Sequence, residues 1–304
     1  MNSATSTDSL NAEQTISQTP FDIPVRRDLE WDFSQVERQF VEGDIFLSYL
    51  YAAFSCGATP IESFFIKSLK PTLDSIVGDD KLKHDVDAMI KQEALHSSTH
   101  RKFNNHLKEL GYDIDGATQY FDNKLKQMVA GFTPIDQLGF VSAAEHGLYS
   151  FAMILLNDRA MQEQIHPQAR RLFVWHFMEE AEHGAVSHDQ YRYFMGNAYS
   201  HRMKTALRAS QHVFNLVDGA LDIFAQGFGH SRSVKNRIAL LKYQWGVLGI
   251  FRPKTTRIAE SPAIRGLPGG ITFPEPVNIP RLCASVPPDP VVFHSFRRYR
   301  YPSS

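Results

Sequence analysis

The sequence predicts an all-α protein whose core is a bundle of four helices. Apolar residues recur at three- and four-residue intervals through most of the chain, and no segment shows the repeated alternation typical of strands. Two Glu-x-x-His motifs, Glu93–His96 and Glu180–His183, lie within predicted helices. Residues three positions apart share one helical face, so each motif presents a carboxylate and an imidazole side by side.

The chain of 304 residues divides into three parts. We predict a flexible N-terminal arm over residues 1–30, a helical domain over 31–250 and an extended Pro-rich C-terminal tail over 251–304. The start of the arm is polar, and ten of the sixteen prolines lie in the tail. The tail also holds too many apolar residues for a solvated linker. We therefore expect it to lie as a strap on the bundle or on a second subunit.

Composition narrows the classes of partner. The net charge of −1 gives no field that would attract nucleic acid. Cys56 and Cys283 are the only cysteines and lie far apart, which fits a reducing compartment. We see no secretory signal and no apolar run of membrane-spanning length. We therefore expect a cytoplasmic protein with no membrane span, and we consider a homodimer.

The first two predicted helices meet at a boundary near Gly57. A helical pattern runs from about residue 34 to residue 54 and ends at Gly57. The segment Thr59-Pro-Ile-Glu62 then has the composition of a helix start, with threonine as N-cap and proline in the first turn. We expect this second helix to run toward Ile76, with a kink or break at Pro71.

The later helices are marked by prolines and glycines at their ends. We predict a long helix over 79–110, a mixed connection with some helical pattern over 111–134, a helix from Pro134 to about Asn157, a helix from Pro167 to about Met195, and further helices near 200–228 and 232–250.

The spacing of four glutamates indicates how these helices connect. Glu62 and Glu93 are 31 residues apart, and Glu145 and Glu180 are 35 apart, which suits two antiparallel helix pairs. Glu93 and Glu145 are 52 residues apart, which leaves room for a long crossover. Two hairpins joined by one crossover form the ferritin-like arrangement, here with extra helices and the Pro-rich tail.

The same residues predict a dimetal site. Two Glu-x-x-His motifs and one glutamate from each of two further helices are the ligand set of carboxylate-bridged dimetal bundles. Four glutamates balance two divalent ions, and His176 lies on the same helical face as Glu180. The predicted metal ligands are Glu62, Glu93, His96, Glu145, His176, Glu180 and His183, and the four glutamates are also the predicted catalytic residues.

Several of these residues have simpler interpretations. A single Glu-x-x-His pair is most often a solvated helix face. Glu62 could cap a helix with Thr59, in which case Glu42 and Asp44 are fallback ligands. His176 could be a buried histidine bonded to a carbonyl. His100 is a rival ligand that we expect to support the site instead. The remaining neighbours are expected to be exposed, to orient ligand histidines or to pack in the core: Glu179, Glu182, Asp189, Tyr149 and Tyr191.

Four segments carry a family resemblance: Ile61-Glu-Ser-Phe-Phe-Ile-Lys-Ser, Gln92-Glu-Ala-Leu-His-Ser-Ser-Thr-His, Ala144-Glu-His-Gly and Trp175-His-Phe-Met-Glu-Glu-Ala-Glu-His. They resemble a bacterial family described as predicted metal-dependent hydrolases and related to ferritin-like diiron proteins. The resemblance covers roughly residues 35–230. The His-x3-Glu-x2-His layout is also similar to that of diiron arylamine N-oxygenases, which add a third histidine to four glutamates and two histidines.

The sequence departs from the family pattern in two places. The segment Gly57-Ala-Thr-Pro-Ile replaces the usual Pro-x-Gly before the first glutamate. Gly184 and Ser187-His188 stand where the family tends to have Lys and Ala-Phe.

From this site we predict a non-haem diiron oxygenase or oxidase that activates O2 to oxidise a small organic substrate. The expected cofactors are two iron ions, with manganese as the rival metal, and O2 is the co-substrate. An external electron donor is a further expected partner. The alternative is a metal-dependent hydrolase that uses a hydroxide bridging the metals. Iron storage is disfavoured, because nothing in the sequence indicates a cage or an acidic entry path for iron.

Overall fold

The computed structural model describes residues 15–43 and 45–230, and these residues form eight helices without a strand. The predicted helix over 232–250 and the Pro-rich tail lie outside the described residues, as do residues 1–14. The helices are α1 (Ile45–Leu73), α2 (Asp80–Glu109), α3 (Ile114–Met128), α4 (Pro134–Asn157), α5 (Arg159–Glu163), α6 (Pro167–His183), α7 (Val186–Met195) and α8 (Tyr199–Gly227).

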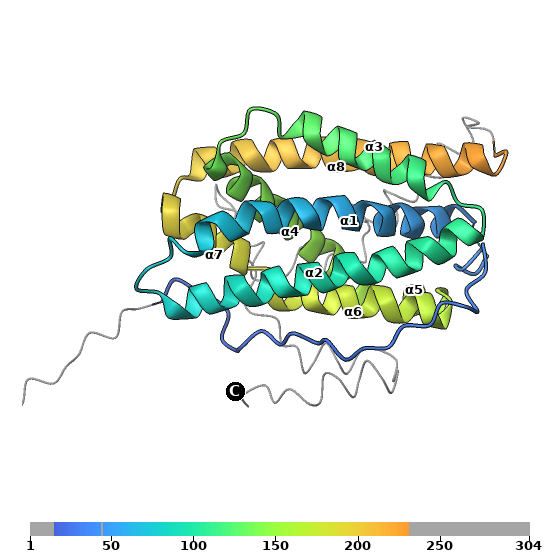
Figure 1. Cartoon of the computed structure of the whole chain (residues 1–304), viewed down its shortest axis with the longest axis horizontal. Coiled ribbons are helices and arrows are strands. Elements are labelled where there is room, and N and C mark those ends of the chain that lie inside the picture. The colour runs from blue at the N-terminus through green and yellow to red at the C-terminus, as the bar shows by residue number, and fades with distance from the viewer. Residues whose placement is uncertain (1–14, 44, 231–304) are drawn as a thin grey trace, which may run out of the picture.

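The helices α1, α2, α4 and α6 form the bundle, which confirms the predicted fold class (Figure 1). Helices α1 and α2 are paired along their length, and α4 packs against α6. The long connection between these two pairs contains α3. Helix α8 lies beside α3 and packs on α1 and α4, so both cover one side of the bundle (Figure 1).

Helix α1 is continuous, which corrects the predicted helix boundary at Gly57–Thr59. Of the kink or break predicted at Pro71, the break does not occur. It also begins at Ile45 rather than near residue 34. The hydroxyl of Thr59 has no hydrogen-bond partner, so it does not cap a helix. A Cβ atom at Gly57 would lie 2.8 Å from the ring of Phe121, so glycine allows α3 to pack closely. Burial of α1 against α2, α3, α4 and α8 outweighs the cost of about 3 kcal/mol that each of its two internal prolines imposes.

The starts of α2 and α4 agree with the prediction because side chains cap them. Asp79 accepts a hydrogen bond from the backbone N–H of Leu82. Thr133 and Asp136 form a reciprocal capping box ahead of α4, with Pro134 in its first turn.

The predicted helix from Pro167 to Met195 is two helices, which is a correction. Helix α6 ends at His183 and α7 begins at Val186. At Gly184, between them, an added Cβ atom would lie 2.6 Å from the ring of Tyr149. The absent side chain therefore lets α4 approach the end of α6.

Two apolar clusters fill the bundle on either side of a polar layer. One cluster contains Tyr51 and Phe173, and the other contains Phe65 and Met89. Glu62 lies between Tyr51 and Phe65 along α1, so the polar layer crosses the bundle near its middle. This arrangement places the predicted ligands inside the core.

Residues 15–30 differ from the flexible arm that we expected. They run beside α2 and α6 as an extended segment (Figure 1). Ile23 and Arg26 are buried, and the backbone N–H of Gln18 donates to Asp189 at 2.7 Å. The apolar residues Phe21, Ile23 and Val25 explain part of this docking, because they pack against the second apolar cluster.

Among the described residues, α4 is the one helix long and apolar enough to cross a membrane. Half of its most apolar window is buried in the fold, and a core helix of a soluble protein passes the same test.

Candidate metal centre

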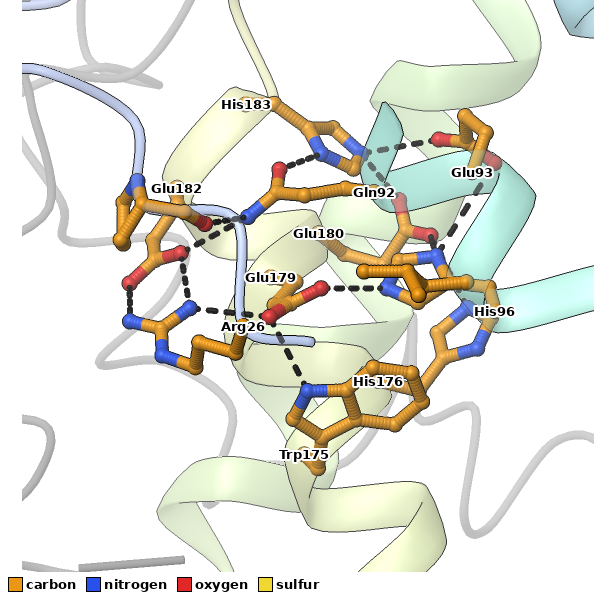
Figure 2. A network of polar contacts seen from close by, with 12 residues as sticks. Arg26, Gln92, Glu93, His96, Trp175, His176, Glu179, Glu180, Glu182 and His183 are labelled. Carbon is orange, nitrogen blue, oxygen red and sulfur yellow. Dashed lines mark hydrogen bonds and ion pairs between the residues drawn. The ribbon is translucent and has the colours of Figure 1, made fainter. Parts of the chain in front are cut away.

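The structure brings all seven predicted ligand side chains together in the middle of the bundle. Helix α1 provides Glu62 and α4 provides Glu145. Helix α2 provides Glu93 and His96, and α6 provides His176, Glu180 and His183 (Figure 2). Each of these residues is at most 2% exposed. Their ligand atoms form overlapping groups of three or four within 4.8 Å of one another.

Two carboxylates, those of Glu93 and Glu180, lie between histidines. Each has one oxygen near His183 and the other oxygen toward a second histidine. Oε1 of Glu180 is 2.9 Å from Nε2 of His176, whereas its Oε2 is 3.2 Å from Nε2 of His183. Oε1 of Glu93 is 3.2 Å from Nε2 of His183, and its Oε2 is 3.9 Å from Nδ1 of His96. Glu93 and Glu180 therefore have the geometry of bridging ligands.

The other two glutamates lie on opposite sides. Oε1 of Glu62 is 3.8 Å from Nδ1 of His176, and Oε2 of Glu145 is 3.3 Å from Nε2 of His183. One side thus offers Glu62 with His96 and His176, and the other offers Glu145 with His183. The arrangement suits two ions with different numbers of nitrogen ligands.

Unsatisfied polar atoms test whether metal ions fit this site. Burying a carboxylate without partners costs several kcal/mol, so such atoms indicate a missing cation. The atoms without a hydrogen-bond partner include both carboxylate oxygens of Glu62, Glu93 and Glu145, Oε1 of Glu180, Nδ1 of His96 and Nε2 of His176. Carboxylate oxygens and imidazole nitrogens in one place suit iron or manganese.

A chain of hydrogen bonds fixes which nitrogen of His176 faces the centre. The amide of Asn104 donates to the carbonyl of Ser55, which turns its Oδ1 toward the Ser55 hydroxyl at 2.6 Å. The hydroxyl donates there and so accepts from Nδ1 of His100 at 2.8 Å. Nε2 of His100 then accepts from Nδ1–H of His176 at 2.8 Å. The lone pair of His176 is left on Nε2, which faces Glu180.

This chain places His100 behind His176 rather than in the centre. Both of its ring nitrogens are hydrogen-bonded, although His100, Glu62 and His176 also offer a group of three ligand atoms. The contact with His176 therefore favours the expected supporting role over metal binding by His100.

The remaining predicted residues are distributed as follows. Glu42 is exposed and outside the cluster, and Asp44 lies outside the described residues. The continuous helix removes the capping interpretation of Glu62. Glu179 contacts His96, and Glu182 contacts Gln92. Asp189 is buried against the arm and contacts no histidine ligand. Tyr149 packs beside Gly184, and the hydroxyl of Tyr191 contacts His201.

Sequence reasoning missed three residues beside the centre. Trp175 donates its indole N–H to Glu179, Gln92 contacts His183, and Arg26 reaches into the bundle from the arm (Figure 2). Gln92 and Trp175 are adjacent to predicted ligands in the sequence, which was a usable signal. For Arg26, the only signal in the sequence was the group of apolar residues just before it.

The buried charges change the acidity of the ligands. Burial and the neighbouring carboxylates raise the pKa of Glu145 to about 7 and raise the pKa of Glu62 and Glu93 well above the ordinary value. Burial alone would lower the pKa of His183, but the nearby carboxylates of Glu180 and Glu145 outweigh it and raise that pKa. Without cations, Glu145 therefore exchanges its proton near neutral pH, and Glu62 and Glu93 hold protons more firmly than an ordinary carboxyl group does.

Metal affinity should consequently depend on pH. Ligand carboxylates must be ionised, so bound ions displace protons from Glu145, Glu62 and Glu93. We expect the apparent affinity to fall as pH decreases from about 8 to about 6, by about tenfold per pH unit for each proton displaced. Competition with a chelator of known proton affinity measures this. An affinity that is unchanged over the range would contradict the assignment of these carboxylates as ligands.

The role of His176 can be tested separately. His176→Ala should leave a folded bundle, because His176 contributes one nitrogen to one side, but it should change the optical or Mössbauer signal of bound iron. His84→Ala on α2 is the matched control, since His84 is 56% exposed. Iron signals that stay as in the wild type while only the stability falls would assign His176 to packing.

Comparison with known proteins gives one match. A family model described as a predicted metal-dependent hydrolase matches residues 25–261, which include Arg26 and all seven predicted ligands. No curated protein matches the chain, and neither does any solved structure.

Proposed function

The chain belongs to the family of predicted metal-dependent hydrolases, and we propose that it is an enzyme whose buried centre holds two metal ions. The unsatisfied oxygens of Glu62, Glu93 and Glu145 support the proposal, because cations would provide the missing partners. Two divalent ions would also balance the four glutamates. We propose iron as the metal, with manganese as the rival.

We further propose that the reaction is the O2-dependent oxidation of a small organic molecule. The observation that carries this proposal is the ligand set itself, four glutamates and three histidines buried inside a helix bundle. Carboxylate-rich sets of this kind hold the metal pairs of di-iron bundles. Four buried carboxylates would also stabilise the higher positive charge that two iron ions carry after reaction with O2, whereas hydrolysis leaves the charge of the metal ions unchanged.

Aromatic rings form the wall beside His176. The ring centroids of Phe54 and Phe177 lie 5.4 and 5.5 Å from that of His176, and Phe151 packs on both phenylalanines. On the other side of the histidines, Trp175 lies edge-on to His96 at 4.9 Å. A dry aromatic shell keeps water from an oxidising centre, which is its role in this proposal.

Metal-dependent hydrolysis is the second candidate, and the family description supports it better than it supports oxidation. Bound metal ions supply a nucleophile from water in hydrolases and electrons for O2 in oxygenases. An oxygenase that inserts one atom of O2 would also need an external electron donor for repeated turnover, because its substrate supplies only half of the electrons that reduce O2. We keep the donor, a small-molecule substrate and a cytoplasmic location as parts of the proposal.

Anaerobic loading with Fe(II) followed by a pulse of O2 separates the two reactions. We expect O2 uptake and a transient visible absorption in the wild type, and neither in Glu180→Gln. Turnover of small ester or phosphoester substrates by anaerobic, metal-loaded protein, without O2 uptake on aeration, would replace oxidation by hydrolysis. The same panel tested on Glu180→Gln shows whether the turnover uses this centre.

A further inference from the structure

The docked N-terminal arm reaches the metal centre through one arginine. Arg26 is 3% exposed and comes from an extended segment outside the bundle. Its guanidinium contacts two carboxylates of α6, with Nη1 3.0 Å from Oε1 of Glu179 and Nη2 2.5 Å from Oε1 of Glu182 (Figure 2). Neither glutamate is among the seven predicted ligands.

Glu179 connects Arg26 to His96. Its Oε1 accepts from Arg26 and from the indole N–H of Trp175, and its Oε2 lies 3.0 Å from Nε2 of His96. A carboxylate that is paired with an arginine accepts hydrogen bonds on both of its oxygens. Nε2 of His96 therefore donates to Oε2 of Glu179 and carries the proton. The lone pair of His96 is then on Nδ1, which faces Glu93 and Glu180 at 3.9 and 3.7 Å.

Gln92 connects the arm to His183. The amide nitrogen of Gln92 lies 2.9 Å from the carbonyl of Pro24 and 3.1 Å from Oε2 of Glu182. Both of these atoms only accept, which fixes the orientation of the amide. Its oxygen therefore accepts from Nδ1–H of His183 at 2.8 Å, which leaves Nε2 of His183 as the nitrogen that faces the centre.

We propose that the arm, through Arg26 and the carbonyl of Pro24, sets the tautomers of both Glu-x-x-His histidines, so that arm docking and metal binding are coupled. Arg26 is a positioning residue in this scheme. It holds Glu179 directly behind His96, and it holds Glu182 so that Gln92 is oriented toward His183. Hydrogen bonds behind metal-binding histidines of this kind fix the ring and the tautomer.

Coupling of this kind is reciprocal. If a docked arm raises metal affinity by some factor, bound metal must favour the docked arm by the same factor. The inference rests on the proposed metal centre and not on the reaction it performs. It therefore makes two predictions, one for a variant and one for the wild-type protein.

The first test measures metal affinity and spectrum in Arg26→Met. This side chain has a similar length but no donors, so Glu179 and Glu182 lose their shared partner. We expect metal affinity to fall by about 10- to 100-fold and the Mössbauer spectrum of the bound iron to change. Arg27→Met is the matched control, because Arg27 is the exposed neighbour of Arg26. Partial recovery in Arg26→Lys would show that the cation matters.

The second test uses wild-type protein, so it does not depend on whether a variant folds. Trypsin cuts the arm after Arg26 and Arg27, and bound metal should slow that cleavage by about tenfold or more, as reciprocity requires. Cleavage after Lys126, on the distant helix α3, reports any general stabilisation. Equal protection of both sites would overturn the coupling.

The outcomes separate this inference from the proposed centre. Wild-type protein with two metal ions, an unchanged affinity in Arg26→Met and equal arm cleavage with and without metal would overturn the inference alone. Wild-type protein that binds no metal would overturn both the centre and the coupling.

Discussion

Replacing Glu180 by glutamine is expected to remove most of the bound metal. Oε1 of Glu180 faces His176 and Oε2 faces His183, so this one carboxylate serves both sides of the centre. Glutamine has nearly the same shape, but it lacks the negative charge and offers only one oxygen. Elemental analysis of purified protein measures the loss as metal ions per chain.

Glu109→Gln provides the control for this substitution. Glu109 is on α2, and its side chain is 80% exposed, so the same chemical change there should leave the metal content as in the wild type. Circular dichroism shows whether each variant keeps its helices. A helical Glu180→Gln protein that retains its full metal content would remove Glu180 from the ligand set.

Removing the metal is expected to cause the largest change in stability. The metal-free bundle buries carboxylate oxygens of Glu62, Glu93 and Glu145 that have no partners. A ligand that binds only the folded state adds about 4 kcal/mol per site when its free concentration is 1,000 times its Kd. For a domain of this size that is an increase in Tm of roughly 10 °C for each site.

Calorimetry with and without chelator measures this difference. The Glu180→Gln variant serves as the control, since metal should raise its Tm far less than that of the wild type. Identical Tm values for metal-loaded and metal-free wild-type protein would show that the folded state binds the ions no more tightly than the unfolded chain does, which contradicts a buried centre.

The clustering of the seven predicted ligands could be anticipated from the sequence because helical geometry turns spacing into direction. Residues three or four positions apart share a face, so His176, Glu180 and His183 had to lie together on α6. The capped starts of α2 and α4 were predictable for a similar reason, since capping depends on a few adjacent residues. The all-α class followed from the same periodicity.

Features decided by tertiary packing were not predictable. The segment around Gly57 and Pro60 reads locally as a helix end, yet contacts with other helices keep α1 continuous. The arm carries no helical period, and the role of Arg26 depends on Glu179 and Glu182, more than 150 positions away. Local patterns do not report such long-range pairs.

The central claim is a pair of metal ions in unequal surroundings within the bundle, and Mössbauer spectroscopy of anaerobically iron-loaded protein tests it most directly. The account predicts two irons per chain in two distinct environments, because His96 and His176 lie on one side and His183 on the other. A protein that holds a single iron, or a single tetrahedral zinc when fully loaded, would contradict the account.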